Sequence, residues 1–296
     1  MTPATGADTL RLGTRGSALA LAQAAIAEAA LRGAGAGTLE TVVVRTIGDR
    51  HPSSAVEELS GQGWFSSELQ HALQDGVIDI AVHSAKDLAT ERPAGLVIAA
   101  TLPRGDPRDA VVTRDGAALE ALPSGARVGT SSRRRAAFLA ALHPQLRSVP
   151  IRGNVDTRLR KLDSGEVDAL LLASAGLDRL GLGDRAAVRL DARSFVSAPA
   201  QGAIAIETRA GSRAEALARA VDDPATAVAM AAERAVLAAL GGGCLLPLGA
   251  FAEVEDGRLT LHAALAGDDE GIATAVVVSD PGDPEGAGRR AAALLR

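Results

Sequence analysis

The chain of 296 residues has very few cysteine and aromatic residues. Cys244 is the single cysteine of the chain. The chain has no tyrosine and one tryptophan, and aromatic residues make up 2% of it. One thiol can form neither a disulfide within the chain nor a cysteine-based zinc cluster, and we assign no metal site. Because 47% of the residues are hydrophobic and so few carry rings, we expect aliphatic cores.

Long apolar runs and a basic overall charge are also missing. No run approaches the length of a membrane span, and residues 1–8 lack the basic and apolar regions of a signal peptide. The formal net charge of -5 argues against a general binder of nucleic acid or of anionic membranes. We therefore expect a cytoplasmic protein that binds neither nucleic acid nor a membrane.

Short apolar runs alternate with helical patterns along most of the chain. This alternation predicts an α/β protein with largely parallel sheets. Strands are predicted at 41–46, 78–83, 96–100, 110–113, 127–129, 147–151, 169–173 and 203–207. Helices are predicted at 17–32, 66–75, 132–142, 156–166, 212–221 and 225–240.

Two segments dense in proline and glycine, 101–109 and 198–202, are predicted to cross between two α/β domains. The first domain is predicted to span 1–102 with a return segment at 199–221, and the second 103–198. Residues 222–296 have a different pattern, which predicts a small α+β domain. Its antiparallel strands are predicted at 248–254, 258–265 and 274–279, and its last helix at 285–295.

Basic residues gather between 127 and 161, where nine arginines or lysines accompany one acid, Asp156. A solvated basic helix face is the ordinary reading of such a segment. Three of the arginines, however, follow a Gly-Thr-Ser-Ser turn at 129–132, and Arg152 and Arg158 follow the next strand. Ligands bind at the carboxyl ends of parallel strands, so these arginines and Arg15 predict a site for a ligand with several carboxylates or phosphates. The absence of a Gly-x-x-x-x-Gly-Lys-Ser/Thr loop weakens a nucleotide interpretation.

Two further motifs carry reactive groups. Cys244 follows three glycines at the end of a predicted helix, which places the thiol on a loop instead of burying it as a small apolar side chain. Such a thiol is available for covalent chemistry, and a loop thiol without a role is the alternative. A strand that ends in His83 is followed by Lys86 and Asp87. An aspartate beside a lysine stays ionised and can stabilise a cation or move protons, although a surface ion pair is a common alternative. His83 is interpreted as a packed strand histidine rather than a catalyst.

Seven motifs, in order and with compatible spacing, resemble the porphobilinogen deaminase (hydroxymethylbilane synthase) family over nearly the whole chain. They lie at 12–20, 81–87, 106–109, 129–132, 152–158, 201–202 and 242–244. The resemblance implies two α/β domains like those of periplasmic binding proteins, followed by the small C-terminal domain with an antiparallel sheet. It implies a monomeric transferase of tetrapyrrole and heme biosynthesis. The enzyme would join four porphobilinogen molecules head to tail into linear hydroxymethylbilane and release ammonia.

The resemblance also implies roles for individual residues. Cys244 would carry a dipyrromethane cofactor through a thioether, and Asp87 would be the catalytic carboxylate. Cofactor-binding positions are Ser84, Lys86, Thr130, Ser132, Arg134 and Arg135. Positions that bind porphobilinogen or the growing polypyrrole chain are Arg15, Ser17, Arg152, Arg158, Arg179 and Gln201.

The sequence departs from the family pattern at four positions. Gln62 and Glu58 stand where the family has lysines in a loop that covers its active site, and Ala200 stands where glycine is common. The segment after Asp178 lacks a residue that is frequently basic in the family. Two alternative functions stay open. A bilobal carboxylate-binding protein without catalysis would explain the arginines but not Cys244 or Asp87. A nucleic-acid binder would need stacking aromatics or a basic face, and the chain has almost no aromatics.

Overall fold

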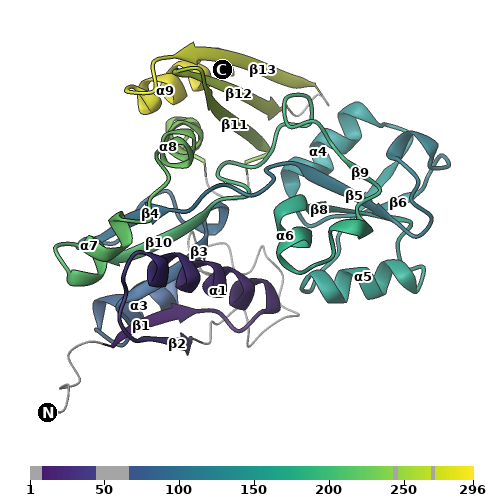
Figure 1. Ribbon diagram of the computed structural model, residues 1–296. Coiled ribbons are helices and arrows are strands. Elements are labelled where there is room, and N and C mark those ends of the chain that lie inside the picture. Colours follow the sequence, from purple (N-terminus) through teal and green to yellow (C-terminus); the bar gives the residue numbers. More distant parts are fainter. Residues whose placement is uncertain (1–8, 45–66, 243–245, 268–270) are drawn as a thin grey trace, which may run out of the picture. The chain divides into compact units, whose positions relative to one another are not determined.

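The computed structural model describes residues 9–44, 67–242, 246–267 and 271–296 (Figure 1). The chain divides into two compact units, Met1–Arg104 with Ala203–Ala227, and Gly105–Gly202 with Val228–Arg296. The C-terminal segment thus shares its unit with the middle of the chain. The division into three domains stays a prediction.

The first unit is built on a five-stranded sheet with the order β2-β1-β3-β10-β4. Its strands are β1 (Leu10–Thr14), β2 (Leu39–Val43), β3 (Ile80–Ser84), β4 (Leu96–Thr101) and β10 (Ile204–Arg209). Its helical segments are α1 (Ala18–Gly33), α3 (Ser67–Gln74), the 3₁₀ turn η1 (Ala85–Asp87) and α7 (Arg213–Arg219). Leu12, Leu31 and Ile206 lie in its aliphatic core, fully buried.

The second unit contains another five-stranded sheet, with the order β7-β6-β8-β5-β9. Its strands are β5 (Asp109–Thr113), β6 (Arg127–Gly129), β7 (Arg147–Val149), β8 (Ala169–Ala173) and β9 (Val188–Arg189). Its helices are α4 (Arg133–Leu142), α5 (Val155–Asp163) and α6 (Ser174–Arg179), with the 3₁₀ turns η2 (Leu119–Ala121) and η3 (Gly183–Arg185).

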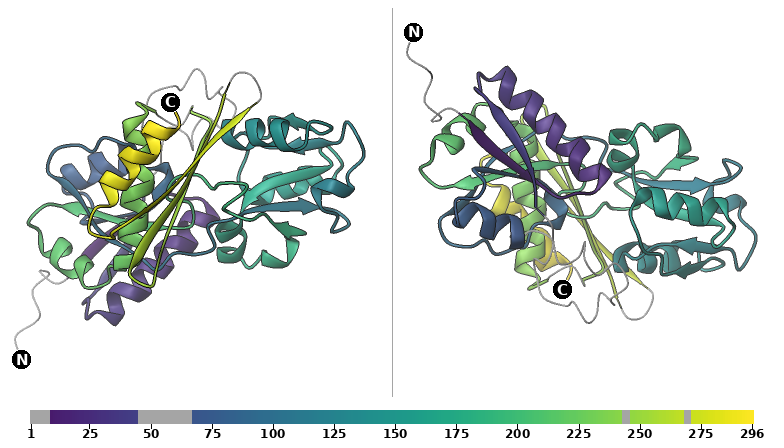
Figure 2. Two further views of the ribbon diagram at one scale, coloured as in Figure 1. Left: turned by 90° about the horizontal axis from the view of Figure 1, so that it is seen from above. Right: turned by 90° about the horizontal axis from the view of Figure 1, so that it is seen from below.

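The same unit ends in an antiparallel sheet, β11 (Leu248–Glu255), β12 (Arg258–Ala266) and β13 (Ile272–Ser279), in that order. One face packs on α8 (Pro224–Ala239) and α9 (Pro284–Leu294), through residues such as Ala232, Leu261 and Ala291. Figures 1 and 2 show both helices beside this sheet. Phe251 lies in the core that contains Phe138 and Phe195.

The α/β class and the antiparallel C-terminal sheet are confirmed, and each predicted element overlaps an observed one, whereas β1, β9 and α6 were not predicted. The expectation of largely parallel sheets is only half right. In each large sheet two strand pairs are parallel and two are antiparallel, because one strand, β10 or β5, runs against the other four. Both reversed strands directly follow the segments predicted to cross between domains. They enter their sheets without the crossover helix that would make them parallel.

Candidate functional site

The carboxyl end of β3 leads directly into the turn that carries Lys86 and Asp87. This turn, η1, is tied to the start of β10 because the Ala85 N–H donates to the Ala203 carbonyl at 3.1 Å. Ala85 is fully buried, Lys86 is half-buried and Asp87 is exposed. Because Ala85 is buried and Asp87 is exposed, the turn presents the carboxylate of Asp87 to any ligand at this edge of the sheet.

Three other predicted site residues lie at the same edge of the first unit. β1 and β3 are parallel neighbours, with Gly13 opposite Ala81, so Arg15 and Ser17 follow the strand next to Ser84. Ser17 caps α1 by accepting the Ala20 N–H at 3.2 Å. The Ser84 hydroxyl exchanges two hydrogen bonds with the side-chain amide of Gln23, at 2.9 and 3.0 Å.

His83 packs beneath this edge. It is 6% exposed, and its Nε2 lies 3.1 Å from Oε2 of Glu207, which is fully buried. The contact is poorly aligned for a hydrogen bond, whereas Gln70 donates to the other Glu207 oxygen at 3.0 Å. The interpretation of His83 as a packed strand histidine is confirmed. The buried carboxylate of Glu207 was not found from the sequence.

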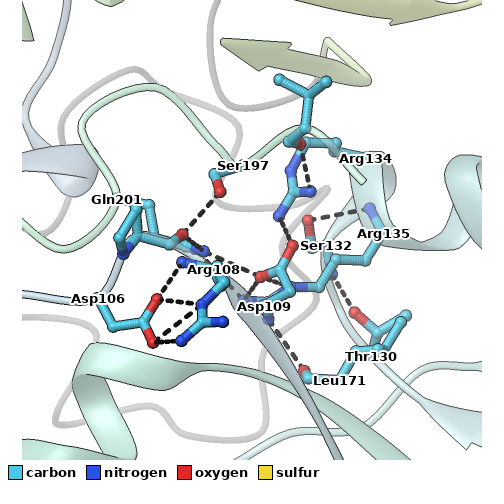
Figure 3. A network of polar contacts seen from close by, with 12 residues as sticks. Asp106, Arg108, Asp109, Thr130, Ser132, Arg134, Arg135, Leu171, Ser197 and Gln201 are labelled. Atoms are coloured by element: carbon cyan, nitrogen blue, oxygen red, sulfur yellow. Dashed lines mark hydrogen bonds and ion pairs between the residues drawn. The ribbon is translucent and has the colours of Figure 1, made fainter. Parts of the chain in front are cut away.

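In the second unit, two of the predicted arginines converge on one acid, Asp109 (Figure 3). Arg134 donates from Nη2 to Oδ2 at 2.7 Å, and Arg135 donates from Nε and Nη2 to Oδ1 at 2.9 and 2.6 Å. Asp109 is fully buried, and Arg134 and Arg135 are 3% and 7% exposed. The anion that accounts for adjacent arginines at the start of α4 is therefore, at least in part, a side chain of the protein itself.

The ionisation of this cluster follows from its contacts. Burial alone raises the pKa of Asp109, but the positive charges of Arg134 and Arg135 and the hydrogen bond from Gln201 lower it further than burial raises it. The pKa of Asp109 consequently lies well below its ordinary value. Burial lowers the pKa of Arg134, and Asp109 offsets part of this effect. The carboxylate stays ionised because two guanidinium groups compensate for its burial.

Thr130, Ser132 and Gln201 surround the same cluster (Figure 3). Ser132 caps α4 by accepting the Arg135 N–H at 3.4 Å, and Thr130 Oγ1 accepts the Ser132 N–H at 3.2 Å. Gln201 is fully buried and donates to Asp109 Oδ1 at 3.0 Å and to the Pro107 carbonyl at 2.8 Å. Gln201 therefore joins the segment after β9 to the start of β5.

The remaining predicted arginines of this unit are half-buried. Arg158 donates to the Gly153 carbonyl at 2.8 Å, and both burial and the charge of Arg135 lower its pKa. Arg179 donates to the Gly202 carbonyl at 2.5 Å. Arg152 follows β7, as expected. The shift at Arg158 indicates that it and Arg135 belong to one positively charged region.

Asp109 was present in a recognised motif, at 106–109, but received no role from the sequence. Its contacts are with two adjacent arginines 25 and 26 residues further along the chain, and spacing alone does not reveal such a contact. Cys244, Gln62 and Glu58 lie outside the described residues. The described part of the chain contains no helix long and apolar enough to cross a membrane, and no cluster of three metal-ligating side chains.

Comparison with known proteins decides the family. Residues 10–216 match the family model "Porphobilinogen deaminase, dipyromethane cofactor binding domain", and residues 227–296 match "Porphobilinogen deaminase, C-terminal domain". The chain belongs to the porphobilinogen deaminase family. The predicted resemblance is confirmed, and the first matched domain agrees with the predicted dipyrromethane cofactor.

Curated relatives agree with this assignment. The chain is 46% identical to the porphobilinogen deaminase of Acidothermus cellulolyticus, over 100% of this chain and 91% of that protein. It is 47% identical to the enzyme of Sphingopyxis alaskensis, over 97% and 94%.

Solved structures that resemble the chain have low sequence identity. A periplasmic VFT2 domain of BvgS from Bordetella pertussis is 19% identical, with a TM-score of 0.42 over 72% of this chain and 86% of that one. A periplasmic substrate-binding protein from Coxiella burnetii is 15% identical, with a TM-score of 0.45 over 76% and 96%.

Proposed function

We propose that the chain is a hydroxymethylbilane synthase, a transferase that joins four porphobilinogen molecules head to tail with loss of ammonia. The observation that carries this proposal is the pair of matches to porphobilinogen deaminase domains, which together span residues 10–216 and 227–296. The family assignment does not favour a carboxylate-binding protein without catalysis. The chain would act in porphyrin and heme biosynthesis.

We assign the catalytic role to Asp87. Its carboxylate is exposed at the end of β3, on a turn whose preceding residue is fully buried and hydrogen-bonded to β10. Loss of ammonia from an aminomethylpyrrole leaves positive charge on the substrate, and a fixed anion stabilises that charge where it develops.

The second unit provides groups that fit carboxylates. Porphobilinogen and dipyrromethane both carry acetate and propionate side chains, so each added ring brings two negative charges. Guanidinium groups and hydroxyls are the donors that such anions require. Arg134, Arg135, Thr130 and Ser132 would hold the cofactor, and Arg152, Arg158 and Arg179 the growing chain. Arg15, Ser17, Ser84, Lys86 and Gln201 would complete the binding positions of both units.

Cys244 would bind the dipyrromethane covalently. When bound, this group supplies a primer of two pyrrole rings to which the first porphobilinogen is joined. The chain has no other cysteine, so no second thiol can substitute for it.

Intact-mass spectrometry after acid denaturation tests the proposal. The purified protein should be heavier than its sequence by one dipyrromethane, and Cys244→Ser should lack the additional mass. Cys244→Ser is a matched control, because sulfur is replaced by oxygen with little change in volume. An active preparation with the unmodified mass would contradict the cofactor assignment.

The finer properties of the enzyme are also proposals. We propose that it acts as a monomer in the cytoplasm and binds neither nucleic acid nor membrane. Light scattering during size-exclusion chromatography should give the mass of one chain, near 29.9 kDa. A mass of two chains at micromolar concentration would contradict the monomer.

A further inference from the structure

Asp109 is a fully buried acid that the proposed mechanism leaves without a role. It is the first residue of β5, the reversed strand of its sheet, and it lies at the end of the 106–109 motif. A buried carboxylate is costly unless it is paired and hydrogen-bonded. Its position among predicted ligand-binding residues therefore calls for a physical explanation.

Both oxygens of Asp109 are used, and by different partners (Figure 3). Oδ2 accepts from Arg134, while Oδ1 accepts from Arg135 and from Gln201. One carboxylate thus fixes the planes of two guanidinium groups that are adjacent in sequence. Without it, two like charges would be buried side by side.

The outer contacts of the two arginines restrict them further. Arg134 donates to the Val196 carbonyl at 2.8 Å, and its Cζ lies 5.7 Å from the ring centroids of both Phe138 and Phe195. Arg135 donates to the Leu171 carbonyl at 3.0 Å. These neutral partners orient the guanidinium groups but leave their charge unchanged.

The charge of the cluster is not balanced from within. Two guanidinium groups and one carboxylate leave one net positive charge, and all three groups are more than nine-tenths buried. Among the described residues, Nε of Arg134 is buried without a hydrogen-bond partner. A ligand carboxylate bound here would compensate the excess charge, whereas a second protein acid would have removed it.

We propose that Asp109 is a positioning residue for ligand binding, which orients Arg134 and Arg135 and leaves one positive charge for a carboxylate of the cofactor or substrate. This proposal rests on the proposed function. Asp109 itself would not contact the reacting atoms. Its effect would appear in cofactor loading and in KM, before it appears in kcat.

Three substitutions test this role. Asp109→Ala removes the carboxylate and leaves space for a small anion, Asp109→Asn keeps the shape without the charge, and Asp109→Glu moves the charge by one methylene. We expect the fraction of Asp109→Ala and Asp109→Asn protein that carries the cofactor, measured by intact mass, to fall at least about tenfold, as for a broken buried charge pair. Sodium formate should restore loading in Asp109→Ala and not in Asp109→Asn, where the amide fills the space.

Asp109→Glu keeps the proposal testable if the other variants do not fold. We expect it to fold, and its KM for porphobilinogen to rise about tenfold with a smaller change in kcat. Wild-type KM and full loading in Asp109→Glu would overturn the proposal. So would formate that raises the melting temperature of Asp109→Ala without restoring its loading, because that result would indicate a purely structural role.

Asp106→Asn is the matched control, since Asp106 belongs to the same motif but pairs with Arg108 and Arg189. It should lose stability and keep its cofactor. An equal loss of cofactor loading in Asp106→Asn and Asp109→Asn would assign the effect to the 106–109 motif as a whole. That result would overturn the positioning role of Asp109. A wild-type protein without the cofactor would instead contradict the proposed function, so the two failures are distinguishable.

Discussion

The two units present charge at their strand ends in opposite ways. In the first unit, Asp87 is exposed on a short turn, and half-buried Lys86 precedes it. In the second, Asp109, Arg134 and Arg135 are nearly or fully buried and depend on one another for compensation. An exposed charge can be removed with little effect on folding. Removing a buried one leaves its partner uncompensated, so binding and stability change together.

The largest expected effect is that of breaking the buried cluster. Arg135→Leu removes two hydrogen bonds to Asp109 and one to Leu171, and should lower the free energy of unfolding by about 3–5 kcal/mol. It should also prevent cofactor assembly, and Arg134→Leu should do the same. Urea unfolding and intact mass measure the two effects.

Arg158→Leu is the comparison for the cluster, because Arg158 is half-buried and donates to the Gly153 carbonyl. We expect it, like Arg152→Leu, to keep its cofactor and to slow substrate binding or elongation. Arg133, which is exposed at the start of α4, should tolerate Leu. Wild-type loading and rate in all four variants of Arg134, Arg135, Arg152 and Arg158 would refute a shared anion site.

Asp87→Asn should be the complementary case, with a large loss of rate and little loss of stability. A preorganised charge of this kind contributes roughly 3–4 kcal/mol to the barrier, so turnover should fall at least about a hundredfold. Asp87→Glu keeps the charge and should retain more activity than Asn. Porphobilinogen consumption and circular dichroism provide the measurements. A folded, cofactor-loaded Asp87→Asn protein with near-normal turnover would move the catalytic role to another acid, with Asp49 the first to test.

A smaller effect is expected at Asp106, whose side chain is 14% exposed. Burial raises its pKa, but hydrogen bonds from Arg108 and Arg189 lower it from 3.8 to about 2. A carboxyl group whose pKa is lower in the folded state stabilises the folded protein at pH values above the pKa that the group has in the unfolded state. That stabilisation is lost as the pH falls from about 4 towards 2.

Asp106→Asn should therefore be less stable than the wild type by about 1–2 kcal/mol at pH 7, because solvent screens the exposed Arg108. The difference should shrink at pH 3. Urea unfolding at both pH values measures it. A difference independent of pH would mean that the charge of Asp106 is not the cause.

The smallest effect concerns Ala200, one of two described non-glycine residues with a positive φ, at 61°. A left-handed conformation costs an L-residue roughly 1–2 kcal/mol, and loss of the buried methyl group offsets part of the gain. Ala200→Gly should therefore stabilise the protein by about 0.5 kcal/mol. Ala192 is also buried but is not among the positive-φ residues, so Ala192→Gly should destabilise the protein. Thermal unfolding compares the two variants. A lower melting temperature for Ala200→Gly would contradict the argument that the left-handed conformation of Ala200 costs free energy.

Much of the fold was predictable because it depends on local patterns. Short apolar runs near Gly and Pro predicted β3, β5 and β8, and the alanine-rich helical pattern at 225–240 predicted α8. The strand β1 was not predicted, since Arg11 interrupts its apolar run and pairs with Asp79, 68 residues away. The two-residue strand β9 is too short to produce a pattern.

The sequence by itself determined the family, the α/β class, the single thiol and the positions of the arginines, because motifs and periodicity are properties of neighbouring residues. Only the tertiary structure decided which charges meet. Asp109 reaches Arg134 and Arg135 across 25 and 26 residues, and Glu207 reaches Gln70 across 137. It also decided that β5 and β10 run against their neighbours. The physical reason is that burial and strand pairing depend on chain segments that are distant in sequence, and no local pattern encodes their approach.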